Sequence, residues 1–213
     1  MIVVDDDSFF TGVGSRDTPL AILRLMSRFS RLQRRKCRTG GARGADEAFE
    51  TNWDPMIYLP HMKWRGKDGF WRWSDAAIDF ADRLLKEVFP YDIQTQQTRE
   101  FFRRNCWQVL GVCETESDVV KSDYVVCWTP DGAVSIDDYQ VGITGGTGIA
   151  INVASIYKVN VLNLQRKDHR AKVVRWCQKK ENEYGLHYDH TSGMHFSKEH
   201  GAQVLAEDLF QAA

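Results

Sequence analysis

Short β-prone runs alternate with amphipathic helical patterns along most of this chain, and this alternation restricts the fold more than any other feature. The clearest buried strands are "FFTGVGS" (9–15) and "SDYVVCW" (122–128). Shorter strands are expected at 36–41, 56–60 and 159–164, with helices at 17–36, 75–89 and 96–110 and after each of two glycine loops. Such alternation predicts an α/β fold: a Rossmann-like, doubly wound, mainly parallel sheet with right-handed crossovers.

The sequence divides where the last expected core strand ends. We expect residues 1–165 to form one Rossmann-like domain. Residues 166–213 are expected to form a small helical C-terminal extension, with a polar, His-rich stretch between its helices, that packs on the domain or on a partner subunit. Because no apolar run approaches the length of a membrane span and no signal peptide is visible, we expect a cytoplasmic protein without membrane contact.

Two glycine loops precede predicted helices, "TGGARGAD" (39–46) and "TGGTGIA" (144–150). Glycines at a helix start allow backbone N–H groups to face a phosphate, which the helix dipole also favours. The alternative is that glycine only permits tight turns with positive φ. Neither loop is a Walker motif or a GxGxxG fingerprint in its proper context, so an ATPase or a standard NAD dehydrogenase is not expected. Together with the segment Gly14–Asp17, the loops are expected to meet at one edge of the sheet and to hold an anionic ligand.

Four segments, in chain order, resemble the SLOG superfamily of Rossmann-like domains: "VGSRDTP" (13–19), "TGGARGAD", "DYVVCWTPDG" (123–132) and "TGGTGIAINVA" (144–154). The superfamily includes the DNA-processing protein A (DprA, Smf) family and the Lonely Guy nucleotide phosphoribohydrolases. The similarity covers about residues 9–165 and is greatest to DprA-like proteins of phages and prophages. It implies that the domain binds a nucleotide or nucleotide-derived signal and, for the DprA branch, single-stranded DNA. Carried over to this chain, the pocket residues are Gly14, Ser15, Arg16, Gly40, Gly41, Gly44, Gly145, Gly146 and Gly148.

The second loop departs from the Lonely Guy motif PGGxGTxxE at its catalytic position. Laid on residues 144–152, the motif has threonine in place of proline, isoleucine in place of its threonine, and Asn152 in place of its glutamate. An amide can hydrogen-bond a ribose but cannot act as a general base. We therefore expect binding rather than turnover, although Asp46, Glu47 or Asp131 could substitute as the carboxylate.

Other side chains complete the candidate ligand site. Arg16 and Arg43 are expected to neutralise phosphate, and Arg104 is a further phosphate candidate because related hydrolases use an arginine on a corresponding helix. Trp128, at the end of a strand, could stack on a base or belong to the core. Thr147 and Asn152 are included through the second loop motif, and Asp46 could equally be a first-turn acid that the helix dipole stabilises.

Charge and histidine patterns leave further alternatives open. Residues 16–38 carry eight basic side chains and one acidic one, whereas residues 181–213 carry six acidic and one basic, in a chain of net charge −1. This polarity indicates either an anionic partner or contact between complementary subunits, so we expect a homodimer or larger homo-oligomer. The loop 61–73 mixes cations with aromatic rings, as single-stranded nucleic acid requires, or folds its aromatics onto the protein.

No metal or cofactor is expected. The histidines of the acidic end lack convincing ligand spacing: His187, His190, His195 and His200. The cysteines are odd in number and without CxxC pairs, which is typical of reduced, mostly buried thiols: Cys37, Cys106, Cys113, Cys127 and Cys177. The leading functional hypothesis is a protein that senses or sequesters a phosphate-containing, nucleotide-derived ligand, such as a cyclic nucleotide signal. The alternatives are a DprA-like recombination mediator that binds single-stranded DNA, and a hydrolase of an N-glycosidic or phosphodiester bond.

Overall fold

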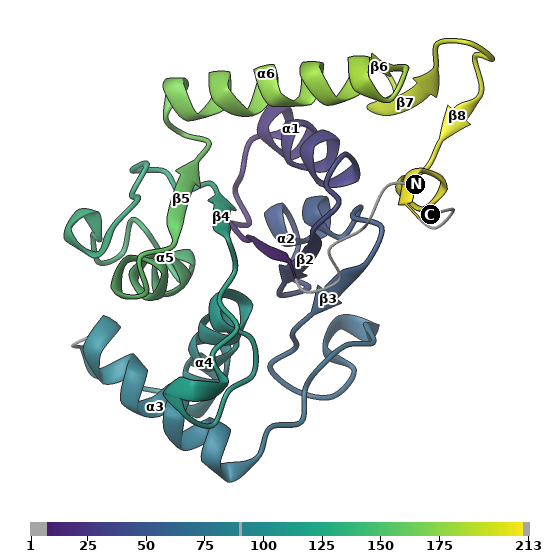
Figure 1. Ribbon diagram of the computed structural model, residues 1–213. Coiled ribbons are helices and arrows are strands. Elements are labelled where there is room, and N and C mark those ends of the chain that lie inside the picture. Colours follow the sequence, from purple (N-terminus) through teal and green to yellow (C-terminus); the bar gives the residue numbers. More distant parts are fainter. Residues whose placement is uncertain (1–7, 90, 211–213) are drawn as a thin grey trace.

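A five-stranded parallel sheet forms the centre of the computed structural model, which describes residues 8–89 and 91–210 (Figure 1). The ends of the predicted domain and extension, residues 1–7 and 211–213, lie outside the described residues. The strands stand in the order β3-β2-β1-β4-β5. Their bounds are Phe9–Gly12 (β1), Lys36–Thr39 (β2), Pro55–Ile57 (β3), Tyr124–Cys127 (β4) and Asn160–Asn163 (β5). This confirms the predicted Rossmann-like α/β fold, with the strand order reversing between β1 and β4.

Helices cover both faces of the sheet because β4 is apolar on both sides. Val125 and Cys127 pack with α3 (Asp75–Val88), α4 (Gln96–Leu110) and α5 (Thr147–Ile156). The alternate residues, Val126 and Trp128, pack with α1 (Leu20–Arg31), α2 (Ala45–Phe49) and α6 (Lys167–Glu183). Three 3₁₀ turns complete the domain: η1 (Trp64–Gly66), η2 (Glu116–Asp118) and η3 (Ile136–Asp138). In Figure 1, α1 lies between the sheet and α6, while α3 and α4 cover the opposite side.

The C-terminal extension contains a small antiparallel sheet in addition to the helices expected from the sequence. Its strands are β6 (Leu186–Asp189), β7 (Met194–Ser197) and β8 (Gln203–Val204), and α7 (Ala206–Phe210) follows. Leu186 and Tyr188 are buried while His187 between them is exposed. This period of two is the strand signal, and the polar, His-rich composition of the stretch obscured it.

The extension is attached to α1 by a buried ionic cluster. Nε and Nη2 of Arg28 donate to the two carboxylate oxygens of Glu181, each at 2.7 Å. Nε2 of His195 lies 3.0 Å from Oε1 of the same carboxylate. All three side chains are buried. Two other arginines of α1, Arg24 and Arg31, donate to the carbonyls of His190 and Gly193, which follow Glu181 in the chain. The basic first helix and the acidic C-terminal region therefore contact each other within one chain.

The cysteines are all free and buried, which confirms the prediction made for them. Within residues 8–89 and 91–210, no three His, Cys, Asp or Glu side chains gather in a way that could hold a metal ion. None of the helices described there combines the length and apolar character needed to cross a bilayer.

Candidate functional site: a cavity at the switch point

A cavity of about 400 Å³ opens beyond the carboxyl end of β1, beside the point where the strand order reverses. In open parallel sheets this is the position at which ligands bind. We call it the switch cavity. Its walls come from residues 13–17 after β1, from Ala42 and Asp46 around the start of α2, from α4, and from residues 143–147 at the start of α5.

The segment after β1 requires glycine at position 14, because the start of α2 and the end of β4 both pack against it there. A Cβ on Gly14 would lie 2.6 Å from the Cβ of Ala45, which is closer than real Cβ contacts. The next residue, Ser15, donates its backbone N–H to the carbonyl of Trp128 at 3.2 Å and so fixes the segment beside the end of β4. Arg16 and Asp17 follow, exposed at the cavity.

The first glycine loop is shaped mainly by its own packing. Gly44 has φ 85°, and a Cβ there would lie 2.9 Å from the carbonyl oxygen of Arg16. A Cβ on Gly40 would lie 2.5 Å from Cζ of Arg104, whose Nη1 donates to the Gly40 carbonyl at 2.8 Å. Of this loop, only Ala42 and Asp46 line the cavity. Positive φ therefore explains Gly44, and the close approach of Arg104 explains Gly40, without a ligand.

A buried ion pair forms part of the cavity wall. Nη2 of Arg104 lies 3.7 Å from Oδ2 of Asp46, which also accepts the Ala42 N–H at 3.2 Å. Burial raises the pKa of Asp46 to about 6, although the charge of Arg104 and the Ala42 N–H both oppose this rise. Burial likewise lowers the pKa of Arg104, against the attraction of Asp46. The cavity therefore contains a carboxylate that titrates close to neutral pH.

Asn105 connects this ion pair to the second glycine loop. Its Oδ1 accepts from Nη2 of Arg104 at 3.0 Å, and its Nδ2 donates to the carbonyl of Gly146 at 2.7 Å. Arg104 also donates to Gly40 in the first loop. The two loops, about a hundred residues apart, are thus joined through adjacent side chains of α4.

The second loop leads directly into α5 and presents the first turn of this helix to the cavity. Gly145, Gly146 and Thr147 line the cavity. Within the described residues, no side chain caps α5. The N–H groups of Gly148 and Ile149 donate to the carbonyls of Gly145 and Gly146 at 3.1 and 3.2 Å, which leaves the N–H groups of Gly146 and Thr147 in this part of the described chain for a ligand. The loop before it is held by the Thr144 hydroxyl, which donates to the carboxylate of Asp131 and accepts the N–H of Gln140 at 2.8 Å.

Half of the sequence-predicted site residues come together in this cavity. Those that line it are Gly14, Ser15, Arg16, Asp46, Arg104, Gly145, Gly146 and Thr147. The remaining residues stand outside its lining: Gly40, Gly41, Arg43, Gly44, Trp128, Asp131, Gly148 and Asn152.

Three of the residues outside the lining have clear structural roles. Asn152 is buried inside the α5 face of the core, where its Nδ2 donates to the carbonyl of Val88 at 2.8 Å. Trp128 is buried on the α1 side of the sheet, and its Nε1 donates to Gln165 at 3.2 Å. Gly148 allows close packing of Tyr139, whose ring would lie 2.3 Å from a Cβ at that position.

Sequence reasoning missed the contribution of α4 to the cavity beyond Arg104. Thr98, Phe101, Phe102 and Asn105 all line it. Their spacing of three, four and seven residues is that of one helix face and was visible in the sequence. What the sequence lacked was any indication that this face, rather than another, is directed toward the glycine loops.

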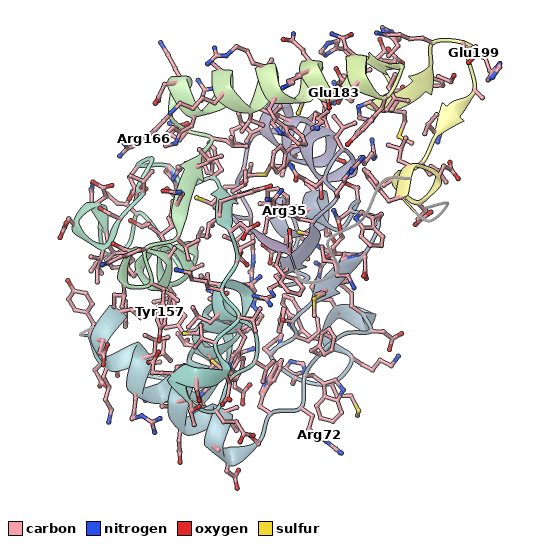
Figure 2. All side chains as sticks on the ribbon, viewed as in Figure 1. Arg35, Arg72, Tyr157, Arg166, Glu183 and Glu199 are labelled. Atoms are coloured by element: carbon pink, nitrogen blue, oxygen red, sulfur yellow. The ribbon has the colours of Figure 1, made fainter. Side chains whose placement is uncertain are left out.

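The basic, aromatic loop 61–73 packs over the first glycine loop. Arg65 donates to the carbonyl of Gly41 at 2.8 Å and pairs with Glu47 at 2.8 Å. Lys67 pairs with Glu50, and Lys63 pairs with Asp68 within the loop. Most cations of this loop are thus neutralised by neighbouring carboxylates. The fourth cation among the lysines and arginines of the loop is Arg72. Figure 2 shows it at the outer edge of the molecule, well away from α5.

Comparison of the chain with family models, curated proteins and solved structures finds no match. The site's geometry and its chemistry therefore carry the functional argument.

Proposed function

We propose that this protein binds a phosphate-containing, nucleotide-derived small molecule in the switch cavity and releases it unchanged. One observation carries the proposal: the uncapped first turn of α5 and the exposed side chain of Arg16 border the same cavity at the reversal of the strand order. A helix N-terminus supplies N–H donors and about half a positive charge. An arginine beside it adds a full charge and a fork of donors that fits phosphate oxygens.

The charges around the cavity favour an anion near α5 and Arg16. The carboxylate of Asp46 lies beside Arg104, with which it forms a nearly neutral pair. Asp17 is the other acidic side chain of the lining and is exposed. Arg16 is the remaining cation of the lining and forms no ion pair with Asp17 within the described residues, so Arg16 and the α5 dipole determine where a phosphate group gains most.

Two residues at which cleavage chemistry was considered, Asn152 and Asp131, are not placed to act in the cavity. Asn152, at the position of the Lonely Guy glutamate, is held in the core by Val88. Asp131 is engaged by the Thr144 hydroxyl and by the N–H of Ala133 at 3.3 Å, and it lies outside the cavity lining. Neither side chain is placed to take a proton from a water molecule in the cavity.

Isothermal titration calorimetry tests the proposal. The purified protein is titrated with the ribonucleoside 5′-monophosphates and with cyclic mononucleotides, and the bound compound is recovered for mass spectrometry. Arg16→Gln should weaken binding about tenfold or more, since a charge-assisted hydrogen bond is lost. Arg43→Gln is the matched control, because Arg43 is an exposed arginine of the first loop outside the cavity lining. Equal effects of the two substitutions, or no binding of any compound, would refute the proposal.

Hydrolysis is a second candidate function, and Asp46 is the observation in its favour. A cavity carboxyl with a pKa of about 6 suits a general acid or base near neutral pH. Recovery of the altered compound by mass spectrometry from the wild-type protein, but not from Asp46→Asn, would establish this candidate and reject release of an unchanged ligand.

Single-stranded DNA binding has less support. Three arginines of α1, which belong to the basic segment 16–38, contact the extension: Arg28 through Glu181, and Arg24 and Arg31 through the carbonyls of His190 and Gly193. The homo-oligomer was expected because a basic segment and an acidic segment lie far apart in the sequence. These two segments contact each other within one chain, so their opposite charges do not require a second subunit. DNA binding would require a strong decrease of affinity with salt, and a flat salt response would exclude it.

A further inference from the structure

One face of α4 contributes two aromatic rings to the wall of the switch cavity, and we call this face the aromatic wall. It is formed by the α4 residues that line the cavity: Thr98, Phe101, Phe102 and Asn105. At about 1.5 Å per residue, this face extends roughly 10 Å along the cavity. Asn105, at one end, contacts the start of α5 through Gly146. The aromatic rings lie between that end and Thr98.

The two rings are held in place by neighbouring side chains. The Phe101 ring lies 5.4 Å from Trp64 in an edge-to-face arrangement, and the Arg104 guanidinium lies 5.5 Å from its centroid. The Phe102 ring lies 5.1 Å from Phe89, also edge-to-face. Both rings are half-buried and contribute to the cavity lining. A planar ligand group that packs there meets rings whose orientation is already fixed, which reduces the entropic cost of binding.

We propose that this wall binds the base of a single nucleotide whose phosphate lies at Arg16 and the first turn of α5. The inference rests on the proposed function and specifies its ligand class: a mononucleotide, rather than a phosphosugar without a base or an inorganic anion. Every base has a π-face that stacks on aromatic side chains. A volume of about 400 Å³ is near the small end of the usual 300–1,000 Å³ for ligand pockets and favours one nucleotide over a dinucleotide.

Calorimetry with two probes tests the wall separately from the phosphate site. The ribonucleoside 5′-monophosphate that binds the wild type most tightly is compared with ribose 5-phosphate, which has the phosphate and sugar but no base. Phe101→Leu and Phe102→Leu keep an apolar side chain and remove the ring. Phe70→Leu is the control, since Phe70 is 48% exposed and outside the cavity lining. Thermal unfolding establishes that each variant is folded.

We expect the wild type to bind the nucleotide more tightly than ribose 5-phosphate. Phe101→Leu or Phe102→Leu should weaken nucleotide binding about fivefold or more, in line with base–aromatic stacking, and leave ribose 5-phosphate binding within about twofold. Equal wild-type affinities for the two probes, or equal losses of affinity for both in the variants, would refute binding of the base by the aromatic wall. The proposed phosphate site would not be affected by this result. If neither probe binds, the proposed function is refuted, and binding of a base by the aromatic wall is refuted with it.

Discussion

The guanidinium of Arg104 and the carboxylate of Asp46, 3.7 Å apart and both buried, form an ion pair in the wall of the switch cavity. Arg104 also donates to Gly40 of the first glycine loop and, through Asn105, is connected to Gly146 of the second. The pair therefore contributes one titratable carboxylate and one cation to the cavity wall, and Arg104 connects the two loops.

Removal of the arginine from this pair should destabilise the fold. Arg104→Met leaves Asp46 buried beside no cation, and breaking a buried pair in this way costs about 3 kcal/mol or more. Urea unfolding measures the loss. In the double variant with Asp46→Asn, part of the stability should return, because no unpaired charge remains. The role assigned to the pair would be contradicted if Arg104→Met lowers the free energy of unfolding by less than about 1 kcal/mol and its effect is the same with and without Asp46→Asn.

Ligand affinity should rise as the pH falls through about 6, where the Asp46 carboxyl takes up its proton. Protonation leaves the charge of Arg104 uncompensated, so the cavity gains one positive charge. At an effective dielectric constant near 20, this is worth roughly 1–2 kcal/mol, or about tenfold in affinity. A cyclic mononucleotide is a suitable calorimetric probe because its phosphodiester keeps the same charge over this range.

The matched variant for this pH dependence is Asp46→Asn, which imitates the protonated carboxyl at every pH. It should bind the cyclic mononucleotide more tightly than the wild type at pH values above about 6, and its affinity should not change with pH. If the affinity of the wild type for the cyclic mononucleotide falls on acidification, protonation of Asp46 does not control ligand binding in this way.

Acid should weaken the attachment of the C-terminal extension. Burial alone would raise the pKa of Glu181, but the hydrogen bonds from His195 and Arg28 lower it to about 2. Because this pKa is below that of an unfolded glutamate, the carboxylate stabilises the folded chain at neutral pH. That contribution is lost as the pH falls from about 4.5 toward about 2.

Urea unfolding over this pH range compares the wild type with Glu181→Gln. The stability difference between them should be largest near neutral pH and should shrink on acidification, while His195 is present in both proteins. A difference that stays constant with pH would show that Glu181 does not act through its charge.

Two glycines at the start of α5 should respond differently to alanine. A Cβ on Gly148 would lie 2.3 Å from the Tyr139 ring, so Gly148→Ala should cost about 1–3 kcal/mol of unfolding free energy. Gly146 has helical φ and ψ (−63° and −26°), and the nearest atom to its Cβ would be 3.9 Å away. Gly146→Ala should therefore be nearly neutral. Thermal unfolding of the two variants side by side distinguishes them, and similar losses would contradict the packing assigned to Gly148.

The fold could be predicted from the sequence because its signals are local. Alternating β-prone runs and amphipathic segments identify the five parallel strands and the helices between them. The helix predicted at 17–36 is shorter, Leu20–Arg31. Pro19, with ψ 144°, stands outside its first turn, and Lys36 already belongs to β2. The strands of the extension were missed because a polar stretch with four histidines concealed the alternation of Leu186 and Tyr188.

The candidate site could be predicted only in part, because a motif does not define the direction of its side chains. Trp128 shares the sheet face of Val126 and so belongs to the core beneath α1. Asn152 is more than one helical turn beyond Thr147, on the side of α5 that packs toward Val88. Phe101 and Phe102, in contrast, have no motif, and only the packing of α4 beside the glycine loops brings them to the cavity.

In the proposed complex, a phosphate group binds at the first turn of α5. The most direct test is an NMR titration of the isotopically labelled protein with the tightest-binding ribonucleoside 5′-monophosphate, with the backbone amide signals followed. We expect the largest shifts at Gly145, Gly146 and Thr147, with smaller ones at Ser15 and Arg16. A titration that leaves the amides of residues 145–147 unchanged, or that shifts only signals of the C-terminal extension, would contradict it.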